Sequence, residues 1–259
     1  MPVFTEGAAT TKSSNLLDVY ELLKTKRWVD LTHSFAPGIP HWHGFPDEER
    51  ETLYYYDEGV GSVGSGIWIH RYSHVGQWGT HADAPAHFVR GTRTLDQIDV
   101  KEMFLPLVVI DIHEKAAKKA DYAVAMDDIR VWESKHGKVP EGCFVALRTD
   151  WSKRWPDPHA MLNQDSTGEH FPGWSMPVLK YLFEERKITA CGHETSDNAP
   201  GVLDPDMAME RYVLSTNHYQ IELLASLDQV PEFGALIVAA FPKPKNGSGF
   251  PARVFAILP

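Results

Sequence analysis

The sequence predicts a mixed α/β protein built as one domain. Runs rich in aliphatic and β-branched residues alternate along the chain with segments whose apolar residues follow helical spacing. Of the 259 residues, 43% are hydrophobic and 23% are charged, a balance that excludes a disordered or fibrous protein. No Pro/Gly/Ser-rich linker or internal repeat divides the chain, so we expect one domain over residues 15–259 after a flexible polar segment at 1–14.

The first expected element is a helix over residues 15–26, where leucines recur at helical spacing after Ser14, a candidate N-cap. Further helical patterns begin after Asp, Ser or Pro start signals, at residues 126–136, 175–186 and 206–214. Strand-like runs dominate the expected core and cover residues 27–31, 66–74, 107–112, 143–148, 188–192, 234–241 and 253–258.

Two long segments, residues 36–66 and 155–173, fit neither pattern and are rich in proline. Loops of this length in a compact domain usually bind ligands or close over a site. Their aromatic side chains suit the wall of an apolar pocket or an interface between subunits, although packing over the core is the alternative for any one of them. These aromatic residues are Trp42, Phe45, Trp155 and Phe171, together with Trp174 directly after the second segment.

Charge and hydropathy exclude several classes of partner. Asp and Glu number 35 against 25 Lys and Arg, so the chain has no basic surplus with which to neutralise a phosphate backbone, and we expect no nucleic-acid partner. The apolar runs are too short to cross a bilayer, so no membrane association is expected. Residues 1–14 lack the cationic start and apolar stretch of a secretory signal, which makes the cytoplasm the expected location.

The two cysteines, Cys143 and Cys191, fall in expected buried strands and are too few for a disulfide framework. We expect them to be inert core residues. No Gly-x-Ser-x-Gly elbow occurs either, so the sequence gives no support to hydrolysis by a serine or cysteine nucleophile.

The chemistry concentrates in residues 74–88, HVGQWGTHADAPAHF, which hold three of the 13 histidines. In an extended segment His81 and Asp83 point to the same face, as do Gln77 and Gly79. Imidazole and carboxylate together suit Zn²⁺ or Mn²⁺, and an ion with three or four protein ligands keeps a position for a water that it activates. One histidine alone would more often be a structural polar residue, but the cluster favours a metal site.

This stretch resembles the His-x-Gly-Thr-His-x-Asp-x-Pro-x-His hallmark of the cyclase family of metal-dependent hydrolases, which includes bacterial kynurenine formamidase and isatin hydrolase. The matching residues are Gly79, Thr80, His81, Asp83, Pro85 and His87. Similarity extends to residues 28–34, 147–153, 222–231 and 245–249, the last two looking particularly like isatin hydrolase. The resemblance implies a swivelling β/β/α fold, a homodimer or homotetramer, and hydrolysis of a small cyclic amide, lactone or formamide by metal-activated water.

The chain departs from the family pattern at two positions. Gln77 stands where the hallmark begins with His; its carbonyl can coordinate a hard cation and favours Mn²⁺ over Zn²⁺, while a simple hydrogen bond to the loop is the open alternative. Glu210 stands where the family carries a His twelve positions before the residue aligned with Glu222. Either glutamate could bind an ion or transfer a proton, and a second ion sharing Asp83 stays open.

The resulting assignment gives each candidate a role. Metal ligands are expected at Gln77, His81, Asp83 and Glu222, and proton transfer is expected from His87 and Glu210. Substrate contacts are expected from Trp42, Phe45, Trp68 and His218, of which His218 could also replace the missing imidazole.

Other polar residues are weaker candidates. His193, Glu194 and Asp197 follow the expected strand 188–192, where functional groups often lie. For His33, His41, His43 and His70, which could line an entrance, packing or surface roles are the stronger expectation. The alternative function is a non-catalytic small-ligand or metal-binding protein on the same fold, which the absence of Cys from the cluster disfavours for structural zinc.

Overall fold

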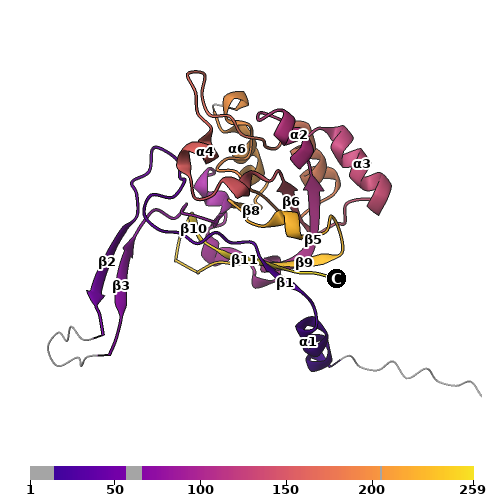
Figure 1. The fold of residues 1–259 in the computed structure, drawn as a ribbon. Coiled ribbons are helices and arrows are strands. Elements are labelled where there is room, and N and C mark those ends of the chain that lie inside the picture. The colour runs from indigo at the N-terminus through magenta and orange to yellow at the C-terminus, as the bar shows by residue number, and fades with distance from the viewer. Residues whose placement is uncertain (1–14, 57–65, 205) are drawn as a thin grey trace, which may run out of the picture.

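The computed structural model describes residues 15–56, 66–204 and 206–259 and confirms the mixed α/β class. The expected flexible segment at 1–14 lies outside the described residues. The main sheet of the described residues has nine strands and curls on itself (Figure 1). In spatial order the strands are β1 (Trp28–Asp30), β11 (Arg253–Ile257), β9 (Ala235–Ala240), β5 (Phe104–Asp111), β6 (Phe144–Arg148), β7 (Ala190–His193), β8 (Tyr219–Glu222), β4 (His81–Asp83) and β10 (Gly249–Pro251).

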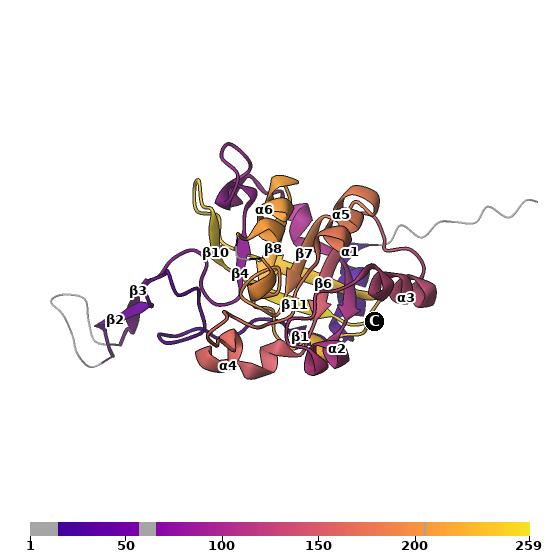
Figure 2. The same ribbon diagram turned by 90° about the horizontal axis from the view of Figure 1, so that it is seen from above.

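Strands β5 to β8 run parallel, and the remaining neighbours in the sheet pair antiparallel. Helices lie over one face of the parallel strands (Figure 2): α3 (Met126–His136), α5 (Met176–Lys180) with the π-helical turn η5 (Tyr181–Glu185), and α6 (Ala208–Ser215). Because the parallel strands are covered on both faces, β6 is apolar at successive positions. Phe144 and Ala146 enter the core inside the curl, whereas Val145 and Leu147 pack beneath the helices.

The remaining helices are short or stand apart. They are α1 (Leu16–Lys24), α2 (His113–Lys118) and α4 (Pro158–Leu162), with single 3-10 turns η1 (Pro85–His87), η2 (Leu95–Gln97), η3 (Val100–Met103), η4 (Trp151–Arg154), η6 (Gly201–Leu203) and η7 (Leu227–Gln229). The four helices expected from the sequence are all present with bounds shifted by a few residues. None of the described helices is long and apolar enough to cross a bilayer; the cytoplasmic location stays a prediction.

The prediction of a core strand at residues 66–74 is wrong. Residues 66–74 contain β3 (Ile69–Ser73), which pairs only with β2 (Glu49–Tyr54) in a two-stranded arm that projects from the body (Figure 1). Most side chains of β3 are exposed. Its Ile and Tyr residues favour extended backbone, but strand propensity does not determine whether a strand is buried. Its partner β2 lies in the segment 36–66, whose sequence fits neither a helical nor a strand pattern.

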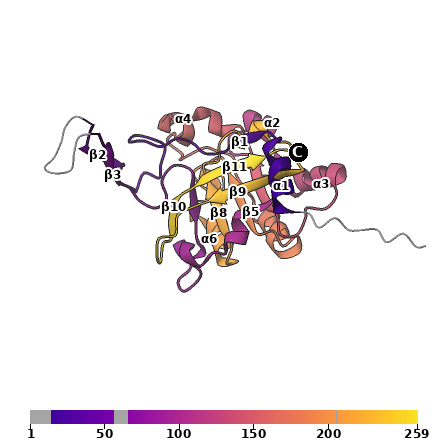
Figure 3. The same ribbon diagram turned by 90° about the horizontal axis from the view of Figure 1, so that it is seen from below.

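Two apolar surfaces of the described chain are uncovered. Helix α1 has no buried residue although most of its side chains are apolar. It stands away from the body in Figure 1, and it overlaps the body in the view from below (Figure 3). The side of β1, β11 and β9 that faces away from the core also carries exposed or half-buried apolar groups. Trp28 stacks on Phe255 there at a centroid distance of 5.4 Å, and Val238 lies opposite both Phe255 and Phe104.

The two cysteines are free and buried, as expected. Burial raises the pKa of Cys143 to about 12 and the pKa of Cys191 further still. Both side chains are therefore thiols at neutral pH, which fits a packing role.

His33 gives the fold a pH-dependent stability. Its ring stacks on Trp155 at 4.3 Å, and burial lowers the pKa of His33 from 6.5 to about 4. Below pH 6.5 the unfolded chain therefore takes up a proton that the folded chain does not. We predict that this site lowers the free energy of unfolding as the pH falls from 6.5 to about 4, and that His33→Phe removes this contribution.

Urea unfolding at about pH 7 and about pH 5 measures the effect as the difference between the two free energies. The control is His159→Phe, which removes an exposed histidine and should leave the difference unchanged. A His33→Phe variant that keeps the wild-type difference would contradict the prediction.

Candidate metal centre

The register between β4 and β8 builds the site. His81 pairs with Glu222 across the two strands, and Asp83 pairs with Gln220. Because side chains alternate along a strand, these four groups share one face, while Ala82 and Ile221 point to the other face and enter the core. All four polar side chains are buried. One register thus brings an imidazole, two carboxylates and an amide together.

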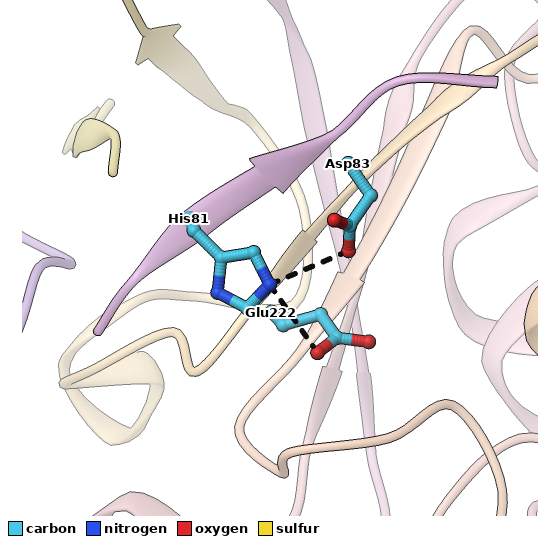
Figure 4. A group of neighbouring side chains, drawn as sticks. All are labelled: His81, Asp83 and Glu222. Carbon is cyan, nitrogen blue, oxygen red and sulfur yellow. Dashed lines mark ion pairs between the residues drawn. The ribbon is translucent and has the colours of Figure 1, made fainter. Parts of the chain in front are cut away.

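His81, Asp83 and Glu222 form the first cluster, with ligand atoms all within 4.8 Å of one another. The Nε2 atom of His81 lies 3.4 Å from Asp83 Oδ2 and 3.5 Å from Glu222 Oε2 (Figure 4). The Nδ1 atom of His81 lies 2.8 Å from the Gly79 carbonyl, to which it donates when protonated. Nε2 is then left as a buried lone-pair donor without a hydrogen-bond partner among the described residues. This donor set fits a divalent cation.

A second cluster joins Asp83 to His87 and Glu210, again with ligand atoms within 4.8 Å. His87 ends η1, which follows β4 after one residue, and Glu210 lies in the first turn of α6. The Nε2 atom of His87 is 3.9 Å from Glu210 Oε1. Glu210 is buried, so it is part of the site and not a solvated surface charge. Asp83 belongs to both clusters.

Burial sets the electrostatics of these acids. Burial and the neighbouring Glu210 raise the pKa of Glu222 well above its usual value, and burial with Asp83 does the same for Glu210. Burial alone would also raise the pKa of Asp83, but His81 lowers it to about 2. In His81, burial opposes protonation, and the Asp83 carboxylate outweighs it, so the pKa of His81 is raised. A bound cation would favour the ionised form of every carboxylate here.

Other residues of the 74–88 stretch shape the backbone that carries these ligands. Gly79 adopts φ +59°, in the left-handed region, and a Cβ atom there would lie 3.0 Å from Phe35 Cβ. Thr80 Oγ1 donates to the Leu223 carbonyl at 2.6 Å and fixes this loop to the chain after β8. Pro85 begins η1, where its missing N–H is no loss, and the turn directs His87 back toward α6.

Two glutamines contact the carboxylates. Gln77 Nε2 donates to Asp83 Oδ1 at 3.1 Å, so Gln77 lies beside the site, and its role as a ligand stays a prediction. Sequence reasoning missed Gln220, whose Nε2 lies within hydrogen-bond distance of Asp83, Glu210 and Glu222. Its position two residues before Glu222 was the available signal, because alternate residues of a strand share a face.

The weaker candidates after β7 separate into different roles. His193 is fully buried with Nε2 3.6 Å from Glu222 Oε1, and burial lowers its pKa to about 3. Glu194 accepts hydrogen bonds from Thr149 and Ser152 and is a structural group. Asp197 lines the cavity above the clusters, where burial raises its pKa to about 7.

A cavity of about 490 Å³ opens onto both clusters. Residues of the two long segments form much of its wall, as expected, including Trp42, Phe45 and Phe171. His41 and His43 also line it. The expected ligands and proton-transfer residues all face this space: Gln77, His81, Asp83, His87, Glu210 and Glu222.

Two expected substrate contacts lie elsewhere in the described chain. Trp68 precedes β3 on the arm, 53% exposed, beside Tyr55 and His70. His218 packs against Phe183 at 5.1 Å and contacts Thr216, so it neither lines the cavity nor replaces the missing imidazole. The prediction for His218 rested on its position four residues before Glu222. It is wrong because His218 lies just before β8 begins, outside the strand that directs Glu222 into the site.

The comparisons with known proteins all indicate the same family. The Cyclase family model matches residues 29–199. Isatin hydrolase of Roseibium aggregatum is 35% identical over 245 residues, which cover 89% of this chain and 91% of that protein. Kynurenine formamidase of Bacillus anthracis is 28% identical over 127 residues, covering 46% of this chain and 57% of that enzyme.

Solved structures agree. Isatin hydrolase A from Labrenzia aggregata, bound to benzyl benzoate, superposes with a TM-score of 0.87 at 33% identity, covering 95% of this chain and 99% of that one. An isatin hydrolase bound to the product analogue thioisatinate gives a TM-score of 0.88 at 29% identity, covering 96% and 99%. With the buried His81–Asp83–Glu222 cluster beneath a cavity, these matches show that the chain belongs to the Cyclase family and is a metal-dependent hydrolase.

Proposed function

We propose that this hydrolase opens or cleaves a small cyclic amide, lactone or formamide with Mn²⁺, in preference to Zn²⁺, held by His81, Asp83 and Glu222. The observation that carries the proposal is the buried His81 Nε2, which has no hydrogen-bond partner among the described residues and lies between two carboxylates at the floor of the cavity. One imidazole among carboxylate oxygens is an oxygen-rich set, which suits Mn²⁺ better than a set of imidazoles would. Gln77, beside Asp83, could add an amide oxygen.

The chain's own residues supply proton transfer. The ion, when bound, polarises the scissile carbonyl and lowers the pKa of water. His87, with a quarter of its side chain exposed, faces the same cavity and lies near Glu210. It takes the proton from the attacking water and delivers it to the leaving nitrogen or oxygen. Glu210, whose pKa burial raises, is placed to share this task because its Oε1 lies 3.9 Å from His87 Nε2.

The aromatic wall supports a planar substrate. Trp42 and Phe45 meet edge to face at 5.0 Å and line the cavity, whose volume suits a small aromatic molecule. The extensive match to isatin hydrolase supports a cyclic amide as the first substrate to test.

The proposed metal site predicts the metal content of the purified protein. Protein prepared without added metal or chelator should hold about one equivalent of manganese per His81–Asp83–Glu222 cluster, and His81→Ala should lose it because an imidazole ligand is removed. Elemental analysis measures this. Gln77→His should shift the content toward zinc, since imidazole favours Zn²⁺. His43→Ala, which changes the cavity wall outside both clusters, is the control and should keep the metal.

If His87 transfers protons, replacing it should lower turnover without releasing the metal. With Mn²⁺ supplied, the wild-type protein should hydrolyse isatin or a simple formanilide, and His87→Ala should lower kcat by about a hundredfold or more because general acid–base catalysis contributes about 10²–10⁴-fold. The His87→Ala protein should keep its metal at the first cluster.

His41→Ala is the matched control, because His41 lines the cavity away from the clusters. Near-wild-type turnover by His87→Ala would remove His87 from the mechanism. If cyclic amides, lactones and formamides all remain intact with metal-loaded wild-type protein, the proposed substrate class is wrong.

We also propose that the chain assembles as a homodimer or homotetramer through helix α1. Its apolar side chains are exposed, Leu16 and Tyr20 among them, beside the uncovered outer face of β1, β11 and β9. Asp18 and Glu21 precede Lys24 along the helix, so antiparallel pairing with a second copy about a two-fold axis places opposite charges together. This charge complementarity favours a second copy as the occupant.

Light scattering after size exclusion tests the assembly. The double variant Leu16→Lys, Tyr20→Lys should reduce the mass from that of an oligomer, because it places charge in the apolar contact. Val131→Lys, at an exposed apolar position on α3, is the control and should leave the mass unchanged. A monomeric wild-type protein, or an unchanged mass in the double variant, would rule out this interface.

A further inference from the structure

We infer that Gln220 is a positioning residue that holds the carboxylates of both clusters in the geometry required by the metal. The inference rests on the proposed metal-dependent function. Gln220 lies in the middle of β8 and is 0% exposed. Its side chain faces the site, whereas the neighbouring Tyr219 and Ile221 enter the core on the other face of the sheet.

The amide nitrogen of Gln220 contacts carboxylates from three different elements. Nε2 lies 3.3 Å from Asp83 Oδ2 on β4, 3.2 Å from Glu210 Oε1 on α6 and 3.0 Å from Glu222 Oε1 on β8. An amide has two hydrogens, so two contacts are full hydrogen bonds and the third is shared. No other described residue is hydrogen-bonded to all three acids. Gln220 therefore links the first cluster, the second cluster and the carboxylate common to both.

The orientation of the amide matters for the ligand atoms. Gln220 engages Glu222 through Oε1, which leaves Oε2 as the oxygen 3.5 Å from His81 Nε2. On Asp83, Gln77 contacts Oδ1, and Gln220 contacts Oδ2, the oxygen that also lies 3.4 Å from His81 Nε2. The reverse orientation of Gln220 would place its carbonyl oxygen against three acceptors. The N–H end of Gln220 thus determines which oxygen of Glu222 is presented to an ion.

A neutral donor suits this position better than the alternatives. A lysine ammonium would supply a positive charge and compete with the ion, and a further carboxylate would add repulsion in a buried site. An apolar side chain would leave the three carboxylates without the hydrogen bonds that offset their burial. An amide stabilises the ionised carboxylates and leaves their remaining lone pairs for the metal.

Titration of Mn²⁺ into chelator-treated protein, followed by calorimetry, tests this role. Gln220→Met preserves length and removes the donor, and it should weaken the Kd for Mn²⁺ about tenfold or more, as loss of a group that orients metal ligands typically does. Tyr219→Phe is the matched control. It removes a buried hydrogen bond of the same strand, from Tyr219 Oη to the Glu102 carbonyl at 2.7 Å, but on the face away from the site. Its Kd should stay within about twofold of wild type.

Two further variants keep the test decisive. Gln220→Asn retains an amide that is one methylene too short, and it should also weaken Mn²⁺ binding even where Gln220→Met folds poorly. Combined with Glu210→Gln, the loss caused by Gln220→Met should be smaller than in the wild-type background, because part of the effect acts through Glu210.

The outcomes separate the inference from the proposed function. If Gln220→Met and Gln220→Asn lower thermal stability but leave the Kd for Mn²⁺ within about twofold of wild type, Gln220 is a structural residue and the inference is wrong. Strictly additive effects with Glu210→Gln would also overturn it. If the wild-type protein binds neither Mn²⁺ nor Zn²⁺, the proposed function itself fails.

Discussion

The burial of three carboxylates in one site is the constraint on which the rest of the structure depends. Asp83, Glu210 and Glu222 lie within a few ångströms of one another and are shielded from water. Buried anions destabilise a fold unless they are paired, hydrogen-bonded or bound to a cation. The imidazole of His81, the amides of the two glutamines and the metal implied by the family all answer this one requirement. The same arrangement that would destabilise the fold without these groups is what suits the site to bind a cation.

The fold supplies the rigidity that such a site needs. Strands β4 and β8 have only three and four residues, but their alternate side chains are anchored in the core inside the curl. Glu210 arrives from α6, whose first turn is capped by Asp204 through hydrogen bonds from the backbone N–H groups of Ala208 and Met209. Thr80 fixes the loop before β4 to the chain after β8. Each ligand is therefore held by an element whose own position is determined by packing, which keeps the ligands in place before an ion binds.

Whether a site residue could be predicted from the sequence depends on how far along the chain it lies from the residues it contacts. His81 and Asp83 are two residues apart, so extended backbone alone places them on one face. The hallmark motif added His87, and the family resemblance beyond the motif added the distant Glu222. Gln220 needed the register between β4 and β8, which pairs residues about 140 positions apart, and no local pattern encodes that register. The arm of β2 and β3 was misread for a related reason. Composition predicts extended backbone in β3, but only the tertiary structure shows that this strand lies outside the main sheet.

The two clusters differ in their access to solvent, and this difference fits the tasks proposed for them. The His81 side chain is 5% exposed, whereas the His87 side chain is 25% exposed at the cavity wall. A metal ligand gains from burial, because exclusion of water strengthens its electrostatic contact with the ion. A proton-transfer group instead needs a path for the proton it exchanges. Asp83, shared between the clusters, couples the two tasks: its charge helps to bind the cation and also lies near the group that moves the proton. Glu210, which stands where the family carries an imidazole, changes this balance toward oxygen ligands and adds a second acid whose pKa burial raises.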